Sequence, residues 1–482
     1  MYRRTKIVAT IGPASESEQM LLALMEAGTD VFRLNFSHGD HAGKARIIRR
    51  LRDLSRQRRQ AVAILADLQG PKIRVGHLRD GAMPLRTGQE VILTARELLG
   101  EGMVIPSDYK GLPQDVKPGD AILLDDGLLE LRALAVNDED VRCQVVVGGT
   151  LKDRKGINLP GARVSIPAMT EKDHEDLRFC LGQEIDYLAL SFVQQAADVL
   201  ALKEQLYQEK SALRVIAKIE KPQAVEDFAA ILDAADGIMV ARGDLGVEMN
   251  PEKVPLIQKR IIRLCNEAGK PVITATQMLE SMIHNPRPTR AETSDVANAI
   301  LDGTDAVMLS GETAAGKYPV EAVSLMVRVA HDVEQDPVLK SKVYHPIPEI
   351  LGYRRLSEAI GQAACRVAEM VGATAILAFT QTGSTAALVA KYRPDLPIFA
   401  ITPSQTARRR LCLYAGIHAL RVAIEGDTEA QIRSVEQVIL SRGVLRRGDI
   451  VVITMGSPVS SPGTTNLLKV HRLGTGNFYE VY

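Results

Sequence analysis

Short aliphatic runs alternate with helical stretches along the chain as far as about residue 342. The runs are nearly unbroken in Val, Ile, Leu and Ala, which is typical of parallel strands buried on both faces. Strands are predicted over residues 6–10, 31–36, 61–67, 187–192, 214–219, 237–241, 271–276 and 305–309. Helices are predicted over residues 17–26, 43–58, 171–181, 196–209, 223–234, 254–268, 289–301 and 320–333. This succession of strand–helix units predicts a (β/α)8 barrel of the TIM type.

A long segment of different character, residues 70–169, separates the third strand from its helix. Its short alternating runs lie at residues 90–94, 121–124, 128–134 and 141–147, with turns such as Pro118-Gly119-Asp120 between them. This spacing predicts a small antiparallel β-barrel domain inserted into the larger barrel. The insertion leaves at the C-terminal end of a strand, where such barrels carry their active sites, so we expect it to form a lid.

The alternation of strands and helices restarts beyond residue 343. Strands are predicted at residues 374–380, 396–402, 417–422 and 450–454, and a linker with two prolines at residues 343–349. This pattern predicts a third domain with an open α/β sheet. The expected domains are thus a catalytic barrel (1–69 and 170–342), a β-lid (70–169) and a C-terminal α/β domain (343–482).

Charge and cysteine usage narrow the class of protein. Basic and acidic residues number 59 each, which argues against a nucleic-acid-binding protein. The five cysteines are scattered without a CxxC pair, which favours free thiols in a reducing compartment. The N-terminus lacks the apolar region of a signal peptide, and no apolar run reaches the ~20 residues of a membrane span. We therefore expect no membrane partner and a cytoplasmic location.

Polar and ionisable residues follow almost every predicted barrel strand. Glu220 and Asp244 come from neighbouring strand ends, and two carboxylates aimed at one point favour a Mg²⁺ site. The alternative is that each pairs with the cation beside it in sequence, Lys221 or Arg242. Lys218 lies on the same face as Glu220, where a lysine suits developing negative charge on a phosphoryl or enolate oxygen. Its alternative role is to neutralise Glu220.

Further polar residues have both a functional and a structural interpretation. Arg33, Arg74 and Lys155 add positive charge from the barrel and the insertion, which suggests a multiply anionic substrate, although each could be a surface charge. A second group, Asn35, Ser37 and Asp67, offers oxygens for a monovalent cation. The structural alternative is that Ser37 caps the next helix and Asp67 organises a turn.

Eight sequence motifs occur in the order found in pyruvate kinases, and the chain resembles this family over essentially its whole length. The motifs are TIGPAS (10–15), RLNFSH (33–38), GPKIR (70–74), KGINLPG (155–161), KIE (218–220), ARGDLG (241–246), TATQMLES (274–281) and LSGET (309–313). The resemblance implies transfer of the phosphoryl group of phosphoenolpyruvate to ADP, giving pyruvate and ATP in glycolysis.

The resemblance also implies roles for individual residues. Glu220 and Asp244 would hold Mg²⁺, with Mn²⁺ as an alternative. Phosphoenolpyruvate would contact Arg33, Lys218, Gly243, Asp244 and Thr276, and Thr276 would belong to the region that delivers a proton to enolpyruvate. The nucleotide side would be served by Asn35, His38, Arg74 and Lys155. This assignment agrees with phosphoryl transfer as a reaction of positioning and charge neutralisation, with a lid that excludes water.

Two positions depart from the pattern of potassium-requiring members. Such members carry Thr where this chain has Leu68 and Glu where it has Lys72, so the chain resembles the potassium-independent branch. The ammonium group of Lys72 would supply the positive charge that K⁺ provides elsewhere. We therefore predict activity without K⁺, and no need for a cation at Asn35, Ser37 and Asp67.

The C-terminal domain resembles the effector domain of the family. Thr380, Thr382, Gly383, Ser384 and Thr385 follow a predicted strand and open a helix, where backbone N–H groups and hydroxyls could cradle a phosphate. The alternative is an ordinary capped helix start. The resemblance favours a sugar-phosphate or nucleotide effector, with residues 457–465 as a second loop, and a homotetramer.

Two other functions compete with this interpretation. A metal-dependent lyase or aldolase on a similar barrel would also use Mg²⁺ carboxylates and an enolate, but would not need Arg74, Lys155 or a cationic lid. A catalytically silent sensor is expected to have lost Lys218, Glu220, Asp244 or Thr276, and all four are present.

Overall fold

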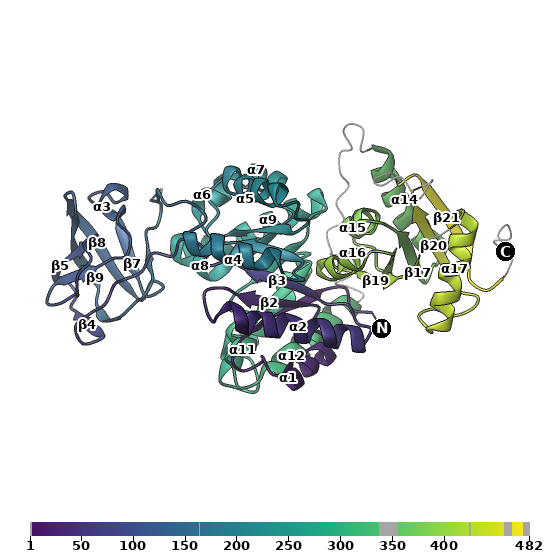
Figure 1. The fold of residues 1–482 in the computed structure, drawn as a ribbon, viewed down its shortest axis with the longest axis horizontal. Coiled ribbons are helices and arrows are strands. Elements are labelled where there is room, and N and C mark those ends of the chain that lie inside the picture. Colours follow the sequence, from purple (N-terminus) through teal and green to yellow (C-terminus); the bar gives the residue numbers. More distant parts are fainter. Residues whose placement is uncertain (1, 163, 337–354, 424–425, 457–464, 476–482) are drawn as a thin grey trace.

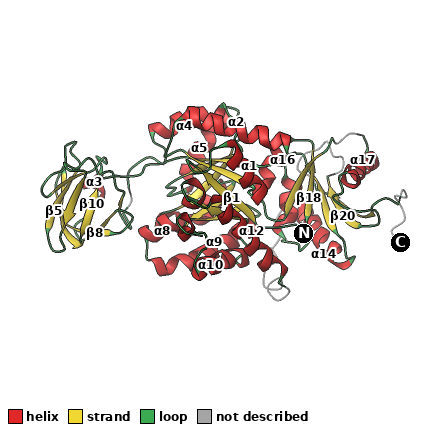
Figure 2. Cartoon of the chain, turned by 90° about the horizontal axis from the view of Figure 1, so that it is seen from below, coloured by secondary structure: helices red, strands yellow, loops and turns green. Residues whose placement is uncertain are grey.

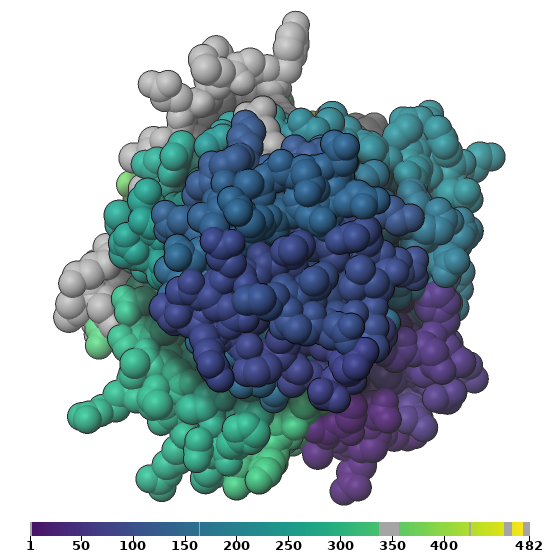
Figure 3. All heavy atoms as spheres, turned by 90° about the vertical axis from the view of Figure 1, so that its left-hand side faces the viewer, coloured from purple at the N-terminus to yellow at the C-terminus, as the bar shows by residue number. Residues whose placement is uncertain are grey.

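Three bodies lie in a row in the computed structural model, which describes residues 2–162, 164–336, 355–423, 426–456 and 465–475. A barrel occupies the centre, the β-rich insertion projects from one end, and the α/β domain packs on the other (Figure 1). Seen along the row from the side of the insertion, the insertion lies in front of the barrel (Figure 3). The arrangement matches the predicted order of domains, and the boundaries proposed for them stay a prediction.

The central barrel is closed, and all its neighbouring strands are parallel. Its strand order is β1-β16-β15-β14-β13-β12-β3-β2. The strands are β1 (Lys6–Ile11), β2 (Val31–Asn35), β3 (Ala63–Asp67), β12 (Tyr187–Leu190), β13 (Arg214–Ile219), β14 (Gly237–Ala241), β15 (Val272–Ala275) and β16 (Ala306–Leu309). The predicted (β/α)8 barrel is thus confirmed. We call the C-terminal ends of these strands the rim and their N-terminal ends the floor.

Helices surround the barrel, as the view from below shows (Figure 2). They are α1 (Glu18–Ala27), α2 (His41–Gln57), α4 (Glu171–Leu181), α5 (Ala196–Gln208), α6 (Pro222–Glu226), α7 (Phe228–Ala234), α8 (Arg242–Glu248), η1 (Pro251–Lys253), α9 (Val254–Ala268), η2 (Glu280–Ile283), α10 (Arg290–Leu301), α11 (Gly311–Ala314) and α12 (Pro319–Gln335). The helix predicted over residues 223–234 is broken at Asp227, whose carboxylate accepts from the N–H of Ala196. Asp40 caps α2, so the suggestion that Ser37 caps this helix is wrong.

The insertion forms two sheets around one core. The six-stranded sheet has the order β11-β7-β8-β9-β5-β6, and β4 pairs with β10 in a second sheet. The elements are β4 (Ala82–Leu85), β5 (Glu90–Thr94), β6 (Val104–Pro106), α3 (Leu112–Asp115), β7 (Ala121–Leu124), β8 (Leu129–Val136), β9 (Asp140–Val147), β10 (Gly149–Lys152) and β11 (Ile157–Asn158). One pair, β5 with β6, is parallel, so the expected purely antiparallel pattern is wrong there.

The C-terminal domain is a five-stranded sheet of order β19-β18-β17-β20-β21. Its elements are α14 (Arg355–Met370), β17 (Ala375–Phe379), α15 (Ser384–Lys391), β18 (Ile398–Thr402), α16 (Gln405–Arg410), η3 (Leu411–Leu413), β19 (Ile417–Arg421), α17 (Thr428–Ser441), β20 (Ile450–Met455) and β21 (Leu467–Arg472). The open α/β sheet is confirmed, but the antiparallel edge strand β21 was not predicted. The linker predicted at residues 343–349 lies outside the described residues.

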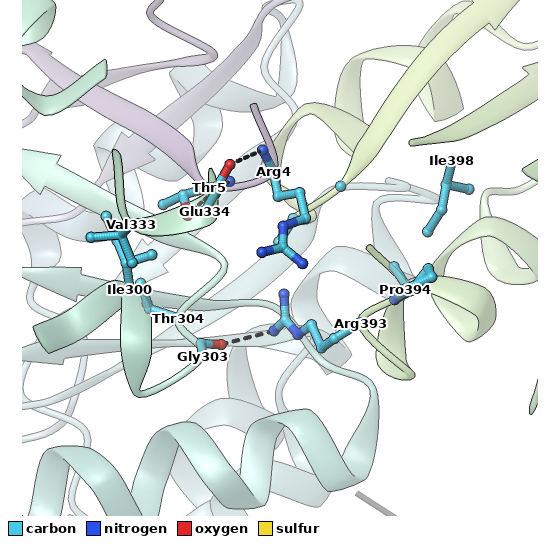
Figure 4. Close-up of a pocket in the computed structure, with 13 residues that line it drawn as sticks. Arg4, Thr5, Ile300, Gly303, Thr304, Val333, Glu334, Arg393, Pro394 and Ile398 are labelled. Carbon is cyan, nitrogen blue, oxygen red and sulfur yellow. Dashed lines mark hydrogen bonds between the residues drawn. The ribbon is translucent and has the colours of Figure 1, made fainter. Parts of the chain in front are cut away.

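The C-terminal domain closes the floor of the barrel. Leu413 of η3 packs into the cluster of side chains that fills the barrel interior, and the hydroxyl of Tyr187 donates to the carbonyl of Arg410 at 2.7 Å. On another side of this contact, Arg393 of the C-terminal domain binds Asp305 at 2.9 Å. It also donates to the carbonyl of Gly303 at 3.0 Å (Figure 4). The floor is therefore occupied by packing, which leaves the rim as the accessible end of the barrel.

The described residues bear on two further sequence predictions. All five cysteines are free thiols, as expected. No helix among the residues that the structure describes has the length and apolar character to cross a membrane.

Candidate active site

Four charged side chains meet at the rim, contributed by β2, β3 and the end of β13. Lys218 Nζ lies 2.8 Å from Glu220 Oε1 and 3.3 Å from Asp67 Oδ1. Arg33 donates from Nε to Asp67 Oδ2 at 2.7 Å, and from Nη1 to the hydroxyl of Thr10 at 3.0 Å. Parallel strands deliver their C-terminal ends to one edge, which brings together residues far apart in sequence.

Burial makes this cluster electrostatically strong. The side chains of Asp67 and Glu220 are 1% exposed and that of Lys218 is 11% exposed. Burial alone would lower the pKa of Lys218, but the carboxylates of Asp67 and Glu220 outweigh it and raise this pKa above its usual range. Burial would raise the pKa of Asp67, but Lys218 and Arg33 outweigh it and hold this pKa below its usual range. Lys218 is therefore a fixed positive charge at neutral pH.

The negative charge of Glu220 is not fully neutralised by the side chains around it. Burial raises its pKa, and the negative charge of Asp244 adds to this effect. The alternative pairings do not satisfy either carboxylate, because Lys221 binds Glu248 at 2.8 Å and Arg242 binds Asp295 at 2.7 Å. Among the described residues, Asp244 forms no ion pair.

This donor set is suited to a divalent cation. Glu220 and Asp244 are oxygen ligands that repel each other, and a cation between them would relieve the repulsion. No group of three or more His, Cys, Asp or Glu side chains in the described part of the chain forms a metal cluster. Two protein carboxylates would leave further positions for water and substrate oxygens, which is how Mg²⁺ is commonly held.

Two residues after β12 support the cluster and were missed from the sequence. The hydroxyl of Ser191 accepts from Lys218 Nζ at 2.8 Å, and the N–H of Phe192 donates to Glu220 Oε2 at 2.6 Å. Phe192 has φ 54°, a left-handed conformation that is unusual for this residue type. The polar Ser191 at a strand end was the available signal, whereas a backbone donor leaves no mark in the sequence.

Strain is also present after β15. Thr276 has φ 69° and Gln277 has φ 52°. The hydroxyl of Thr276 accepts from the N–H of Gly243 at 2.7 Å and donates to the carbonyl of Ala275 at 2.6 Å, while Arg242 binds the carbonyl of Thr276. Such conformations cost roughly 1–3 kcal/mol each and often occur where a site must be held in place. Thr276, Gly243 and Asp244 thus lie together, as the sequence analysis expected.

Of the three residues suggested for a monovalent cation, Asn35 and Asp67 lie in register on adjacent strands, and Ser37 lies just beyond the end of β2. The amide oxygen of Asn35 accepts from the N–H of Ser37 at 3.0 Å. The carboxylate of Asp67 is already compensated by Arg33 and Lys218, so the alternative that it organises a turn is wrong. Little unpaired negative charge is therefore left here to bind a monovalent cation.

The basic side chains that the insertion was predicted to contribute contact other residues of the insertion and do not contact the rim cluster. Lys155 binds Asp125 at 2.8 Å, Lys72 lies 3.9 Å from Asp126, and Arg74 Nη1 donates to the carbonyl of Arg154 at 3.2 Å. These pairs are all internal to the insertion. The structure therefore does not bring Arg74 and Lys155 to Arg33, nor Lys72 to Asp67. His38 follows β2, where its carbonyl accepts from Lys44.

The suggested effector loop opens α15 directly after β17, as predicted. Gly383 has φ 100°, and its N–H donates to the hydroxyl of Thr380 at 2.9 Å. The hydroxyl of Thr382 donates to that of Ser384, and Thr385 contacts Thr465 at 3.1 Å. Residues 457–464 of the second predicted loop lie outside the described residues.

The chain is similar to known proteins over nearly its whole length. The family model "Pyruvate kinase, barrel domain" matches residues 2–323, and "Pyruvate kinase, alpha/beta domain" matches residues 358–471. A pyruvate kinase of Geobacillus stearothermophilus is 48% identical over 98% of this chain and 80% of its own length, and one from Staphylococcus aureus strain USA300 is 46% identical over 98% and 81%. The crystal structure of a pyruvate kinase from Cryptosporidium parvum superposes with a TM-score of 0.90 at 38% identity, covering 98% of this chain and 96% of that one. The chain therefore belongs to the pyruvate kinase family, the enzymes that transfer the phosphoryl group of phosphoenolpyruvate to ADP.

Proposed function

We propose that the rim cluster around Lys218 is the place where this phosphoryl group is transferred. The observation that carries the proposal is a buried, permanently charged lysine between two carboxylates at the accessible end of the barrel. In phosphoryl transfer the protein mainly positions the reactants and neutralises charge. Lys218 would bind the phosphoryl or enolate oxygen as negative charge develops there.

Arg33 is proposed to orient the phosphoryl group beside Lys218. Its guanidinium is fixed by Asp67 and Thr10, so little side-chain freedom is lost when a substrate binds. Asp67 would act through Arg33 and Lys218 as a positioning residue.

Glu220 and Asp244 are proposed to hold Mg²⁺, with Mn²⁺ as an alternative. The bound metal would neutralise charge on the substrate oxygens. The mutual repulsion of the two carboxylates and the missing ion pair of Asp244 in the described residues support this assignment.

Thr276 and Gly243 are proposed to act at the enolpyruvate stage. Phosphoryl transfer leaves enolpyruvate, which becomes pyruvate when a proton is added to carbon. The hydroxyl of Thr276, held by Gly243 and Ala275, would place a water or hydroxyl proton near that carbon. The backbone N–H of Gly243 would contact phosphoenolpyruvate once a substrate oxygen replaces the Thr276 hydroxyl.

The nucleotide is proposed to bind between the rim and the insertion. Asn35 and His38 would contribute from the barrel, and Arg74 and Lys155 from the insertion. Since the two insertion cations pair internally in this structure, movement of the insertion toward the rim would bring them to the ADP phosphates. Such closure would also exclude water from the phosphoryl donor.

Activity is proposed to be independent of K⁺. The full compensation of Asp67 by Arg33 and Lys218 supports this, since no unpaired charge there calls for a monovalent cation. Lys72 would add its charge on closure of the insertion. Replacement of K⁺ by tetramethylammonium at constant ionic strength should leave the rate unchanged, and a many-fold loss would contradict the proposal.

Regulation is proposed to depend on a sugar phosphate or nucleotide that binds the loop opening α15. The protein is proposed to form a homotetramer, and each chain to have the three domains given above. The hydroxyls of Thr382 and Ser384 and the backbone at Gly383 support an anion site. A Thr382→Ala/Ser384→Ala variant should lose the effector response, and an unchanged response would contradict this location.

The direct test is pyruvate formation from phosphoenolpyruvate and ADP by the purified chain. Activity with Mg²⁺ and its disappearance on removal of divalent cations with EDTA are expected. No pyruvate from the folded protein under any condition, with sugar phosphates present, would favour the lyase or sensor alternative.

A further inference from the structure

An arginine-rich cavity lies where the barrel meets the C-terminal domain, away from the rim. Its volume is about 630 Å³, and seven arginines line it against one carboxylate, Glu184. From the barrel come the end of α2 and the segment after it, and from the C-terminal domain come α16, β19 and the end of α17. We call it the arginine cavity.

Three of these arginines are paired and form its fixed wall. Asp186, which is fully buried, binds Arg52 at 2.6 Å and Arg409 at 2.8 Å. Arg409 also lies 3.3 Å from Glu184, and Arg56 binds Asp53 at 2.6 Å. Because Arg52 belongs to the barrel and Arg409 to the C-terminal domain, Asp186 locks the two domains together beneath the cavity.

The other four arginines form no ion pair within the described part of the chain: Arg59, Arg408, Arg421 and Arg442. Two of them bind carbonyl groups: Arg408 donates to the carbonyl of Arg59 at 2.6 Å, and Arg421 donates to that of Pro403 at 3.2 Å. Burial lowers the pKa of Arg408, and the like charges of Arg442 and Arg421 lower it further. Scattered surface arginines are ordinarily solvated and need no partner. Here Arg442 and Arg421 repel Arg408 at one cavity that Arg59 also lines, so a bound anion would remove an existing electrostatic cost.

The dimensions of the cavity limit the choice of anion. Small-molecule sites usually span ~300–1,000 Å³, and this one exceeds the space needed for inorganic phosphate alone. Arginine presents a planar fork of donors that matches phosphate oxygens. We propose that the arginine cavity binds the phosphate of a small phosphomonoester, and that the bound anion couples the C-terminal domain to the barrel.

Helix α2 supplies the physical link from this cavity to the proposed active site. It begins at His41, shortly after Arg33 and His38, and ends at Gln57 beside Arg59. A helix of 17 residues spans about 25 Å as one rigid element. An anion bound between Arg59, Arg408 and Arg442 would therefore restrain one end of a helix whose other end adjoins the rim, and its affinity would be linked to that of phosphoenolpyruvate.

Binding is tested on the full chain by calorimetric titration at constant ionic strength with glucose 6-phosphate, AMP and inorganic phosphate. The test variant is Arg59→Gln/Arg442→Gln, since both side chains are exposed and hold no carboxylate. The matched control is Arg58→Gln/Arg433→Gln, which removes the same charge from the same two helical regions outside the cavity. Loss of charged hydrogen bonds should weaken binding of the preferred probe by at least about tenfold in the test variant alone.

The outcomes separate this site from the effector loop. Tighter binding of glucose 6-phosphate or AMP than of inorganic phosphate supports the proposal. Which of the two binds tighter shows whether the phosphate is carried by a sugar or by a nucleotide. No binding of any probe to the wild type, equal affinity in test and control variants, or loss confined to Thr382→Ala/Ser384→Ala would overturn the site. The preferred probe should also shift the KM for phosphoenolpyruvate in the wild type, and binding without any such shift would overturn the coupling.

Discussion

Both ends of the barrel bury charged side chains, but they differ in how completely those charges are satisfied. At the floor, Asp186 divides its oxygens between Arg52 and Arg409 and also accepts from the N–H of Ile64. At the rim, Asp67 is paired with both Arg33 and Lys218, but Glu220 has only a share of Lys218, and Asp244 forms no ion pair among the described residues. A network whose groups are all paired stabilises a fold, whereas an incompletely paired one at an accessible position is suited to binding ligands.

The largest effect is expected from removing the shared lysine of the rim. Lys218→Met should lower kcat by about 10²–10³-fold, because a fixed charge that stabilises developing negative charge is lost. The measurement is steady-state pyruvate formation with saturating Mg²⁺. Binding of the metal should survive, since both carboxylates remain.

Lys221→Met is the matched control for this comparison. Lys221 is similarly buried but binds Glu248 at the C-terminal end of α8, and Asn158 of the insertion binds the same carboxylate. Its loss should lower stability by leaving a buried carboxylate unpaired, while kcat falls much less than in Lys218→Met. Equal losses of kcat would mean that the rim lysine has no special role.

The floor network should respond in stability and leave the chemistry largely intact. Asp186→Ala leaves Arg52 and Arg409 without their buried partner, which should cost about 3–5 kcal/mol of unfolding free energy. Asp53→Ala, which removes an exposed partner of Arg56, should cost no more than about 1 kcal/mol. Urea unfolding checks both, with kcat per folded molecule as the second readout. Similar unfolding midpoints for the two variants would contradict the stabilising role of Asp186.

Next to the floor, β19 of the C-terminal domain contains a histidine that is held neutral. Burial lowers the pKa of His418 to about 2, with Lys6 and Arg3 adding to the effect, and its ring lies against Tyr2 and Phe399. The unfolded chain takes up this proton near the ordinary value of 6.5 and the folded chain does not. Stability should therefore fall as the pH drops below that value, by at most about 1.4 kcal/mol per pH unit.

His418→Phe should remove this part of the pH dependence. The comparison is the unfolding free energy of both proteins between pH 8 and pH 5. At pH 8 both rings are uncharged, so any difference there reports packing alone. Parallel curves down to pH 5 would show that His418 is not kept neutral in the folded protein.

The sequence predicted the architecture of the barrel because strands buried on both faces leave unbroken aliphatic runs. It missed the edge strand β21, whose residues Leu467–Arg472 include charged and half-exposed positions. It also missed the break at Asp227, because a capping contact with Ala196 overrides an otherwise continuous helical pattern.

The site was predictable where topology alone decides proximity. Lys218, Glu220, Asp244 and Thr276 all lie at or just after the C-terminal ends of parallel strands, so their place at the rim follows from the fold. The position of Lys155 relative to the rim depends on how two domains are oriented, which no periodicity reveals, and in this structure Lys155 pairs within the insertion. The arginine cavity was missed for the same reason, since Arg59 and Arg442 come from different domains.

The smallest effect concerns backbone strain, which also separates the rim from ordinary loops. Gln277 and Lys210 are both exposed and both have φ 52°, but Gln277 follows Thr276 whereas Lys210 ends the turn after α5. Glycine at either position should raise the unfolding free energy by up to about 1 kcal/mol, because the left-handed conformation costs glycine nothing.

Activity should distinguish the two variants. Gln277→Gly frees the backbone that holds Thr276 against Gly243, so kcat should fall severalfold, with little change in the affinity for ADP. Lys210→Gly should leave kcat as it is, because nothing at the rim depends on that turn. Thermal unfolding and steady-state kinetics on the same preparations check both expectations. If Gln277→Gly gained stability and kept its full kcat, the strain after β15 would be a feature of the fold and would play no part in positioning Thr276.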